Sequence, residues 1–334
     1  MGRIVIELTN RCNLRCRHCY EGRHGGNAEL SLTVLDNILR DAKQHGFDEL
    51  AFTGGEPTIH RQFFDVIEHS TQRGYRFGFV SNGWNFPKIH QRLLPFKDQL
   101  TSITFSLDGA TEVTHDNLRG KGSFRRLLKA MSVCVAKDIP FSINTVVTTL
   151  NCDQLDELVA LAIPLGSQGV RFGHYIESGH EDSVGLRLTD DLRRRIEADI
   201  WQLRDQAPIP VAMAPGYVTD ELFPCAPLNL EEFNIDWQGN IGKCCHLSGF
   251  GETHPSSDIA GNLNDISFTE AVKRLKLEND AFRRHKAIDQ QSREFTDTDL
   301  SPCEYCCRHY RKGRFVQQTA PVAVEIQPLS RQHN

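Results

Sequence analysis

Residues 3–20 read RIVIELTNRCNLRCRHCY. The β-rich run at 3–8 predicts a strand, and a polar loop follows in which Cys12, Cys16 and Cys19 have the spacing C-x3-C-x2-C. Thiolates are the natural ligands of iron–sulfur clusters and of zinc. The start of the chain therefore predicts a metal site directly after its first strand.

The spacing of these three cysteines fits two kinds of metal site. Three thiolates leave one iron of a four-iron cubane without a protein ligand. A structural zinc site is normally closed by a fourth ligand, which His18 or His24 could supply. Spacing alone does not separate the two.

Strand and helix patterns alternate through the first half of the chain. Helical patterns, the first of them capped by Ser31, separate expected strands at 3–8, 49–53, 75–80, 102–107, 140–148 and 169–172. This alternation predicts βαβ units and a parallel sheet. Six units are too few for a complete eightfold barrel, so an open doubly wound sheet and a partial barrel both fit. The polar, glycine-rich and cysteine-rich segments follow the strands, where parallel α/β folds place their active sites.

Composition excludes several classes of protein. The 334 residues are 39% apolar and 24% charged, with a net charge of −5, so a packed core is feasible. This charge gives no general attraction for nucleic acid or for an anionic membrane. No apolar run approaches the ~18 residues of a membrane span, and the start does not resemble a signal peptide. We therefore expect a cytoplasmic protein with neither a nucleic-acid nor a membrane partner.

The eleven cysteines indicate metal chemistry rather than disulfides. Their number is odd, and clustered cysteines in a reducing compartment are typical of metal or catalytic sites. Cys134 and Cys152 are isolated, and Cys134 lies in a helical apolar pattern that predicts a small buried side chain. The other nine form three groups: Cys12, Cys16 and Cys19; Cys225, Cys244 and Cys245; Cys303, Cys306 and Cys307.

The second half of the chain has a different organisation. It predicts an amphipathic helix at 192–203, a hairpin at 233–243, a helix at 268–277 and a polar connection at 289–302. The arginines at 193–195 accompany several acidic residues, which predicts a solvated face of mixed charge. The expected domains are 1–185, 186–316 and a disordered tail at 317–334.

Several short polar motifs follow the expected strands. Two adjacent glycines let the backbone approach a ligand closely, and a carboxylate beside them suits an ammonium group, although each motif alone is typical of a turn. In chain order the motifs are Gly54-Gly55-Glu56-Pro57, Ser81-Asn82-Gly83, Ser106-x-Asp108-Gly109 and Arg119-Gly120.

Together, the cysteine loop and these motifs resemble the radical S-adenosylmethionine (SAM) enzymes over most of the chain. The resemblance implies an α/β fold, a partial (β/α)6 barrel. It implies that Cys12, Cys16 and Cys19 bind a [4Fe–4S] cluster whose fourth iron is chelated by SAM, and that His18 is the aromatic residue before the last cysteine. The SAM-binding residues that it implies are Gly54, Gly55, Glu56, Ser81, Asn82, Ser106, Asp108 and Arg119.

The later cysteines resemble the small C-terminal iron–sulfur extension called SPASM, or its shorter form called twitch. A cysteine, a hairpin glycine, a second cysteine and a closing C-x2-C match the family pattern. No cysteine follows Cys307, which favours twitch and one auxiliary [4Fe–4S] cluster. The resemblance assigns this cluster to Cys225, Cys244, Cys303 and Cys306. Cys245 and Cys307 are alternative ligands, and four thiolates are also a good zinc set.

The resemblance implies reductive cleavage of SAM to a 5′-deoxyadenosyl radical, which abstracts hydrogen from a substrate C–H bond. The expected electron donor is of the flavodoxin or ferredoxin type. The favoured function is crosslinking or oxidation of a ribosomally made peptide. A dehydrogenase or epimerase of a sugar or aminocyclitol is the alternative, and a non-catalytic zinc protein is a remote one. His174, Tyr175 and Glu177 follow the sixth strand and are candidates for the substrate pocket.

Overall fold

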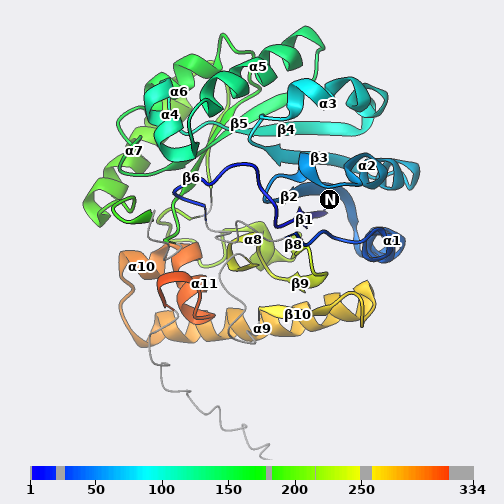
Figure 1. The fold of residues 1–334 in the computed structure, drawn as a ribbon. Helices are drawn as coiled ribbons and strands as arrows, with labels where there is room; N and C mark the ends of the chain where they lie inside the picture. The colour runs from blue at the N-terminus through cyan, green and yellow to red at the C-terminus, as the bar shows by residue number, and fades with distance from the viewer. Residues whose placement is uncertain (1, 20–26, 178–182, 215, 249–257, 316–334) are drawn as a thin grey trace, which may run out of the picture.

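A single curved sheet organises the molecule. The computed structural model describes residues 2–19, 27–177, 183–214, 216–248 and 258–315. In these residues ten strands form the sheet, in the order β10-β9-β8-β1-β2-β3-β4-β5-β6-β7 (Figure 1). The strands are β1 (Gly2–Thr9), β2 (Phe47–Gly54), β3 (Arg76–Ser81), β4 (Leu100–Ser106), β5 (Phe141–Val147), β6 (Val170–His174), β7 (Val211–Met213), β8 (Glu232–Ile235), β9 (Asn240–Gly242) and β10 (Ile259–Asn262).

The pairing explains why the barrel is open. All neighbours from β8 through β1 to β7 are parallel, whereas β9 and β10 are added antiparallel. Strands β7 and β10 are the two ends of the sheet and do not pair with each other. The α/β class and the unclosed, barrel-like parallel sheet are therefore confirmed. The hairpin expected at 233–243 is β8–β9, and it extends the same sheet rather than forming one of its own.

The helices between β1 and β7 lie on the outer side of the curved sheet (Figure 1). Ser31 caps the first helix as predicted, because its Oγ accepts the Val34 N–H at 3.2 Å. The α-helices of the described residues are α1 (Leu32–Asp41), α2 (Phe63–Gln72), α3 (Phe86–Leu93), α4 (Glu112–Arg119), α5 (Ser123–Ala136), α6 (Leu155–Ala162), α7 (Asp190–Gln206), α8 (Cys245–Ser248), α9 (Phe268–Ser292), α10 (Asp297–Leu300) and α11 (Pro302–His309). None of them is long and apolar enough to cross a membrane.

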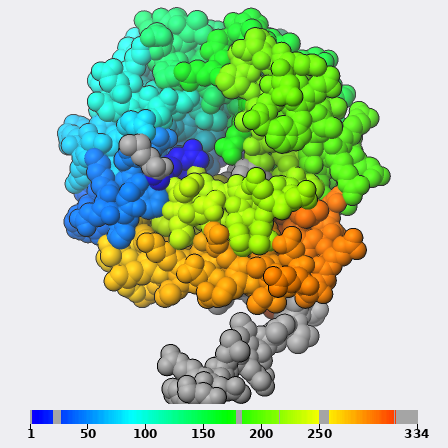
Figure 2. All heavy atoms as spheres, turned by 180° about the vertical axis from the view of Figure 1, so that it is seen from behind, coloured from blue at the N-terminus to red at the C-terminus, as the bar shows by residue number. Residues whose placement is uncertain are grey.

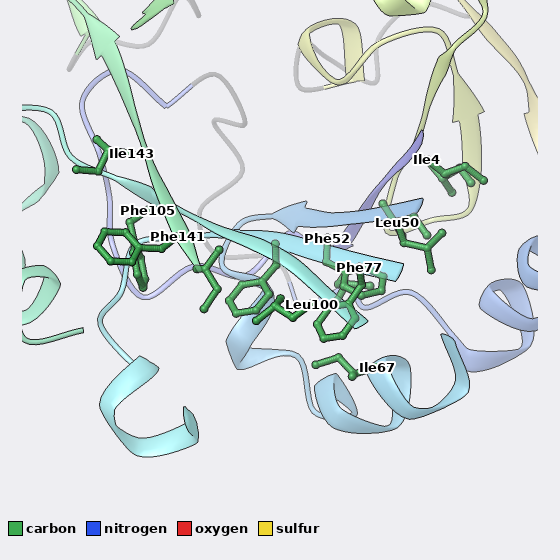
Figure 3. Close-up of a cluster of buried hydrophobic side chains, with 14 of the residues drawn as sticks. Ile4, Leu50, Phe52, Ile67, Phe77, Leu100, Phe105, Phe141 and Ile143 are labelled. Carbon is green, nitrogen blue, oxygen red and sulfur yellow. The ribbon is translucent and has the colours of Figure 1, made fainter. Parts of the chain in front are cut away.

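The main core lies between the sheet and its outer helices. Strand side chains alternate between the two faces, and the outward set is aromatic and aliphatic (Figure 3). In β5, for example, Phe141 and Ile143 are buried in this core, whereas Ser142 and Asn144 point to the opposite, inner face. The inner face is consequently left for polar groups, and Figure 2 shows the molecule hollowed at its centre, between the barrel segments and the C-terminal segments.

Two expectations for the second half were wrong. Helix α9 continues to Ser292, well beyond 277, because Asn279, Phe282 and Lys286 extend its buried face. The face at 193–195 is not uniformly solvated, since the Arg193 side chain is only 2% exposed. Its guanidinium lies 3.8 Å from Glu304 of α11, so acidic partners compensate for the burial. The expected tail at 317–334 lies outside the described residues, and the boundary at 185 stays a prediction.

Phe268 tests how strongly α9 contributes to the fold. Its ring lies 6.2 Å from that of Phe47 and is fully buried, whereas Leu277 on the same helix is 72% exposed. Phe268→Ala should lower the free energy of unfolding by about 3–5 kcal/mol, because it leaves a cavity in the core. Leu277→Ala, the matched control, should change it by less than about 0.5 kcal/mol. Urea denaturation provides the measurement, and equal midpoints for the two variants would contradict this packing.

Candidate active site

The first cysteine loop is held against the end of β2 by backbone contacts. The Gly55 N–H donates to the Thr9 carbonyl at 2.7 Å, and the Glu56 N–H donates to the Arg11 carbonyl at 2.8 Å. A Cβ on Gly55 would collide with the Arg11 carbonyl oxygen, and Gly54 has φ +116°. The close approach of the end of β2 to the cysteine loop therefore requires both glycines. The sequence predicts that this motif lets the backbone approach a ligand, and in the structure it also lets two backbone segments approach each other.

Polar groups from other strand ends reach the cysteine sulfurs. The Leu14 N–H donates to Cys12 Sγ at 3.4 Å, and Asn82 Nδ2 donates to it at 3.9 Å. Arg119 Nη1 donates to Cys16 Sγ at 3.9 Å. Burial raises the pKa of Cys12 to about 12 and also raises that of Cys16. Without a metal these buried thiols stay protonated, so binding of a cluster must release their protons.

Glu56 is a buried carboxylate with several hydrogen-bond donors. Its Oε1 accepts from the Thr58 hydroxyl at 2.6 Å, the Thr58 N–H at 3.3 Å and the Ser81 hydroxyl at 2.9 Å. Its Oε2 accepts from the Asn82 N–H at 2.8 Å. Burial raises the pKa of Glu56, and these hydrogen bonds oppose the rise. Oε1 already accepts three hydrogen bonds, whereas Oε2 accepts one. Oε2 is therefore the oxygen that can accept a further hydrogen bond from a ligand ammonium group.

Asp108 links Arg119 to the cysteine loop. Its Oδ2 forms an ion pair with Arg119 Nε and lies 3.2 Å from His18 Nε2, while its Oδ1 accepts the Val146 N–H at 2.8 Å. Burial alone would raise the pKa of Asp108, but Arg119 and His18 lower it below its usual value. Asp108 is thus a fully buried anion that joins Arg119 of α4 to His18 of the cysteine loop.

The imidazole ring of His18 is neutral, and only one of its two nitrogens has a polar partner among the described residues. Burial lowers the pKa of His18 to about 4, although Asp108 opposes the shift. Its Nε2 faces Asp108, while its Nδ1 is buried without a hydrogen-bond partner among the described residues. Because Asp108 holds Nε2, it is Nδ1 that stays available to a ligand; His24 lies outside the described residues.

Some supporting residues were not predicted from the sequence. Asn151 donates to the carbonyls of Asp108 and Val146 at 3.0 and 2.9 Å, and His115 Nδ1 accepts the Asp108 N–H at 3.1 Å. His115 and Arg119 are four residues apart on α4 and so lie on the same face of the helix. This spacing could have predicted that His115 contacts the same strand end as Arg119. The sequence around Asn151 does not predict its role, because Asn151 acts by donating to the Asp108 carbonyl, which follows another strand.

The later cysteines come together from three segments. Cys225 precedes a short 3-10 helix at Ala226–Asn229, Cys244 follows β9, and the remaining pair, Cys303 and Cys306, lies on α11. Burial raises the pKa of Cys303, and Cys225 and Cys306 raise it further. Cys244 also lies within electrostatic range of Cys303 and Cys225. Cys225, Cys244 and Cys306 pack against one apolar cluster, so the segments that carry the four thiols assigned by resemblance lie beside one another.

The two alternative cysteines have different surroundings. Cys307 is fully buried in an apolar cluster with Leu228 and Tyr305, and burial raises its pKa. Cys245 begins α8 and has a lowered pKa, for which a hydrogen bond with Cys244 is the main cause. Among the described residues, no three His, Cys, Asp or Glu side chains lie close enough to hold a single metal ion together.

The three pocket candidates after β6 lie in different surroundings. His174 Nε2 is 3.4 Å from Glu304 Oε1, and its ring is 5.9 Å from that of Tyr217. Tyr175 packs with Leu118 in a separate small cluster, and Glu177 is half-buried. Their part in binding substrate stays a prediction.

The curved parallel sheet, with a cysteine loop at the end of its first strand, defines a class of cluster-binding α/β enzymes. A family model described as the radical SAM superfamily matches residues 6–162. An AdoMet-dependent heme synthase of Methanosarcina barkeri is 32% identical to this chain and is aligned over 80% of each chain. The mycofactocin maturase MftC of Mycobacterium ulcerans is also 32% identical, over 82% of this chain and 75% of the relative. The chain belongs to the radical SAM superfamily.

A solved structure has the same fold. Streptococcus suis SuiB bound to its precursor peptide SuiA superposes with a TM-score of 0.66 and 20% sequence identity. The match covers 81% of this chain and 64% of the SuiB chain.

Glu56 can be tested by a single isosteric change. Glu56→Gln replaces one carboxylate oxygen with an NH2 group, which faces hydrogen-bond donors and cannot accept from them. A buried donor left without an acceptor lowers stability by about 1–3 kcal/mol. We expect SAM affinity to fall roughly tenfold to a hundredfold, together with a loss of stability. Calorimetric SAM titration and urea denaturation give the two values, with the exposed Glu157→Gln as control. Equal SAM affinity in wild type and Glu56→Gln would remove Glu56 from the SAM site.

The auxiliary cysteines can be tested by metal analysis. Replacing both Cys303 and Cys306 with Ala should lower iron and sulfide by about four each per chain, since a cubane needs these thiolates. Some SAM cleavage should remain, because the first cysteine loop is untouched. Cys152→Ala serves as control for the loss of a free thiol. If the folded double variant keeps its full iron content, these two cysteines are not cluster ligands.

Proposed function

We propose that this radical SAM enzyme cleaves SAM reductively and modifies a ribosomally made peptide. The observation that supports SAM chemistry best is the convergence of strand-end side chains on the cysteine loop, with Asn82 on Cys12 and Arg119 on Cys16. Relatives named mycofactocin maturase support a peptide substrate, as does a PqqA peptide cyclase of Rhodopseudomonas palustris, 24% identical over 98% of this chain. A cytoplasmic location fits this function.

The residues at the first site fit a cluster with SAM bound to it. When bound, the reduced cluster and SAM supply a 5′-deoxyadenosyl radical that removes a hydrogen atom from a substrate C–H bond. Cys12, Cys16 and Cys19 would hold three irons. Hydrogen bonds from Asn82 and Arg119 to the sulfurs would stabilise the negative charge of the cluster and so influence its potential.

The same site has groups suited to the polar parts of SAM. Glu56 Oε2 would accept from the SAM ammonium, and the hydrogen bonds of Thr58 and Ser81 would keep that carboxylate in place. The remaining SAM-binding candidates, inferred from the resemblance, are Gly54, Gly55, Asn82, Ser106, Asp108 and Arg119. The unpartnered Nδ1 of His18 gives this pocket a further buried acceptor.

We assign a second [4Fe–4S] cluster to Cys225, Cys244, Cys303 and Cys306. Two buried lysines support this assignment, because Lys286 and Lys243 both lie within electrostatic range of Cys306. Such a cluster would accept an electron during substrate oxidation or anchor the substrate. A flavodoxin or ferredoxin is the donor class that we expect for the first cluster. A zinc set at these cysteines would instead contain no sulfide.

A second candidate function has one specific support. The heme synthase relative matches this chain as well as the peptide maturases do, at 32% identity. It favours a small-molecule substrate of the tetrapyrrole class over the sugars and aminocyclitols that we considered from the sequence. The two candidates differ in the product that anaerobic turnover yields.

The cysteine loop provides the test of SAM cleavage. Replacing Cys12, Cys16 and Cys19 together with Ala should abolish 5′-deoxyadenosine formation under dithionite, because no protein ligands for the first cluster remain. Chromatography with mass spectrometry measures the product, and Cys152→Ala is the control. Undiminished 5′-deoxyadenosine in the triple variant would refute the assignment.

The substrate class is tested by the same anaerobic turnover. A short precursor peptide encoded beside the gene should lose hydrogen, with a mass decrease of 2 Da or a multiple of it expected for a crosslink or an oxidation. Conversion of a tetrapyrrole, with no change in the peptide, would favour the second candidate.

A further inference from the structure

Three neighbouring strands place polar side chains at one level of the inner face. Ser106 of β4 pairs with Asn144 of β5, and Asn144 pairs with Arg171 of β6. Paired residues of adjacent parallel strands point to the same face of a sheet. Because Ser106 is the last residue of β4, this level lies just before Asp108 and the proposed SAM site.

Arg171 is exposed on this inner face. Val170 and Phe172, its neighbours on β6, are buried in the outer core, so alternation directs Arg171 inward. No carboxylate in the described residues lies within ion-pair distance of it. The two other arginines placed on the same face by this alternation are both paired, Arg3 with Glu232 and Arg76 with Glu49. Among the described residues, an unpaired guanidinium on the inner face of the sheet is therefore unusual.

Asn144 lies next to Arg171. A Cβ built on Gly173 would lie 4.0 Å from Asn144 Nδ2, and Gly173 is two residues from Arg171 on the same face of β6. The Asn144 side chain makes no hydrogen bond within the described residues. Its amide N–H groups and the guanidinium thus form neighbouring donors that no group of the described residues uses. A ligand held at this level of the inner face would lie beside Ser106, one of the proposed SAM-binding residues.

We propose that Arg171 and Asn144 bind a carboxylate of the substrate. This inference rests on the proposed function, because it assigns a substrate group to the same active site. A guanidinium and a carboxylate form two parallel hydrogen bonds, and the Asn144 amide adds a third donor to the same two oxygens. A single fixed cation matches the single charge of a carboxylate. A peptide carries carboxylates at two places, the chain terminus and acidic side chains.

The test measures binding without turnover, so it does not depend on the reaction. Four probes are titrated calorimetrically into the reconstituted chain with SAM and without reductant. N-acetylglycine and N-acetylglycinamide represent the chain terminus, and N-acetylaspartate 1-amide and N-acetylasparagine amide represent a side chain. Wild type should bind at least one acid about tenfold or more tightly than its matching amide. The pair with the larger ratio identifies the source of the carboxylate.

Variants connect this preference to the two residues. Arg171→Gln should remove the acid preference, and Asn144→Ala should reduce it severalfold. The exposed Arg195→Gln, which removes the same charge from α7, should preserve it. SAM affinity, measured without substrate, should stay at the wild-type level in all three variants. This value keeps a failed carboxylate site distinct from a failed SAM assignment.

Two results would overturn the proposal. One is an equal affinity of acid and amide in wild type, or an unchanged preference in Arg171→Gln. The other is a parallel loss of SAM affinity in Arg171→Gln, which would place Arg171 in the SAM site instead.

Discussion

The hydrogen bonds from Gly55 and Glu56 to the carbonyls of Thr9 and Arg11 are the contact on which the site depends. They fasten the cysteine loop to the end of the neighbouring strand, and the backbones approach so closely that no side chain fits at Gly55. The Glu56 carboxylate follows directly, and two of its four donors, the Ser81 hydroxyl and the Asn82 N–H, come from the end of the next strand. Three successive strand ends are thereby connected, which brings together the polar groups that we propose for a cluster and SAM.

Charge in this site is balanced by chain segments distant in sequence. Asp108 is a fully buried anion, and its cost is offset by Arg119, His18 and the Val146 N–H. The cysteines are partly buried, and the pKa of Cys12 is raised to about 12. Deprotonation of such thiols needs a metal, so loading of the site and its final electrostatic state are coupled.

The sequence predicted what local patterns determine. The six strands and the cysteine loop follow from periodicity and spacing, and the structure bears out the alternation. Burial of Arg193 was not predictable, because its partner Glu304 is more than one hundred residues away. The length of α9 was missed for a similar reason, since polar Asn279 and Lys286 face the protein interior only through contacts with other segments. Nor does any local pattern show that Arg171 has no ion-pair partner in the described part of the chain.

The pairing of β8 with β1 has a consequence for biosynthesis. Strand β1 is made first, yet one of its edges is covered only by residues 232–235. An uncovered strand edge can pair with other chains, and contacts over such sequence separations form slowly. The nascent chain therefore exposes that edge, beside the cysteine loop, until more than two hundred further residues have left the ribosome. Chaperones and the cluster-assembly machinery have this interval in which to reach the loop before the sheet is complete.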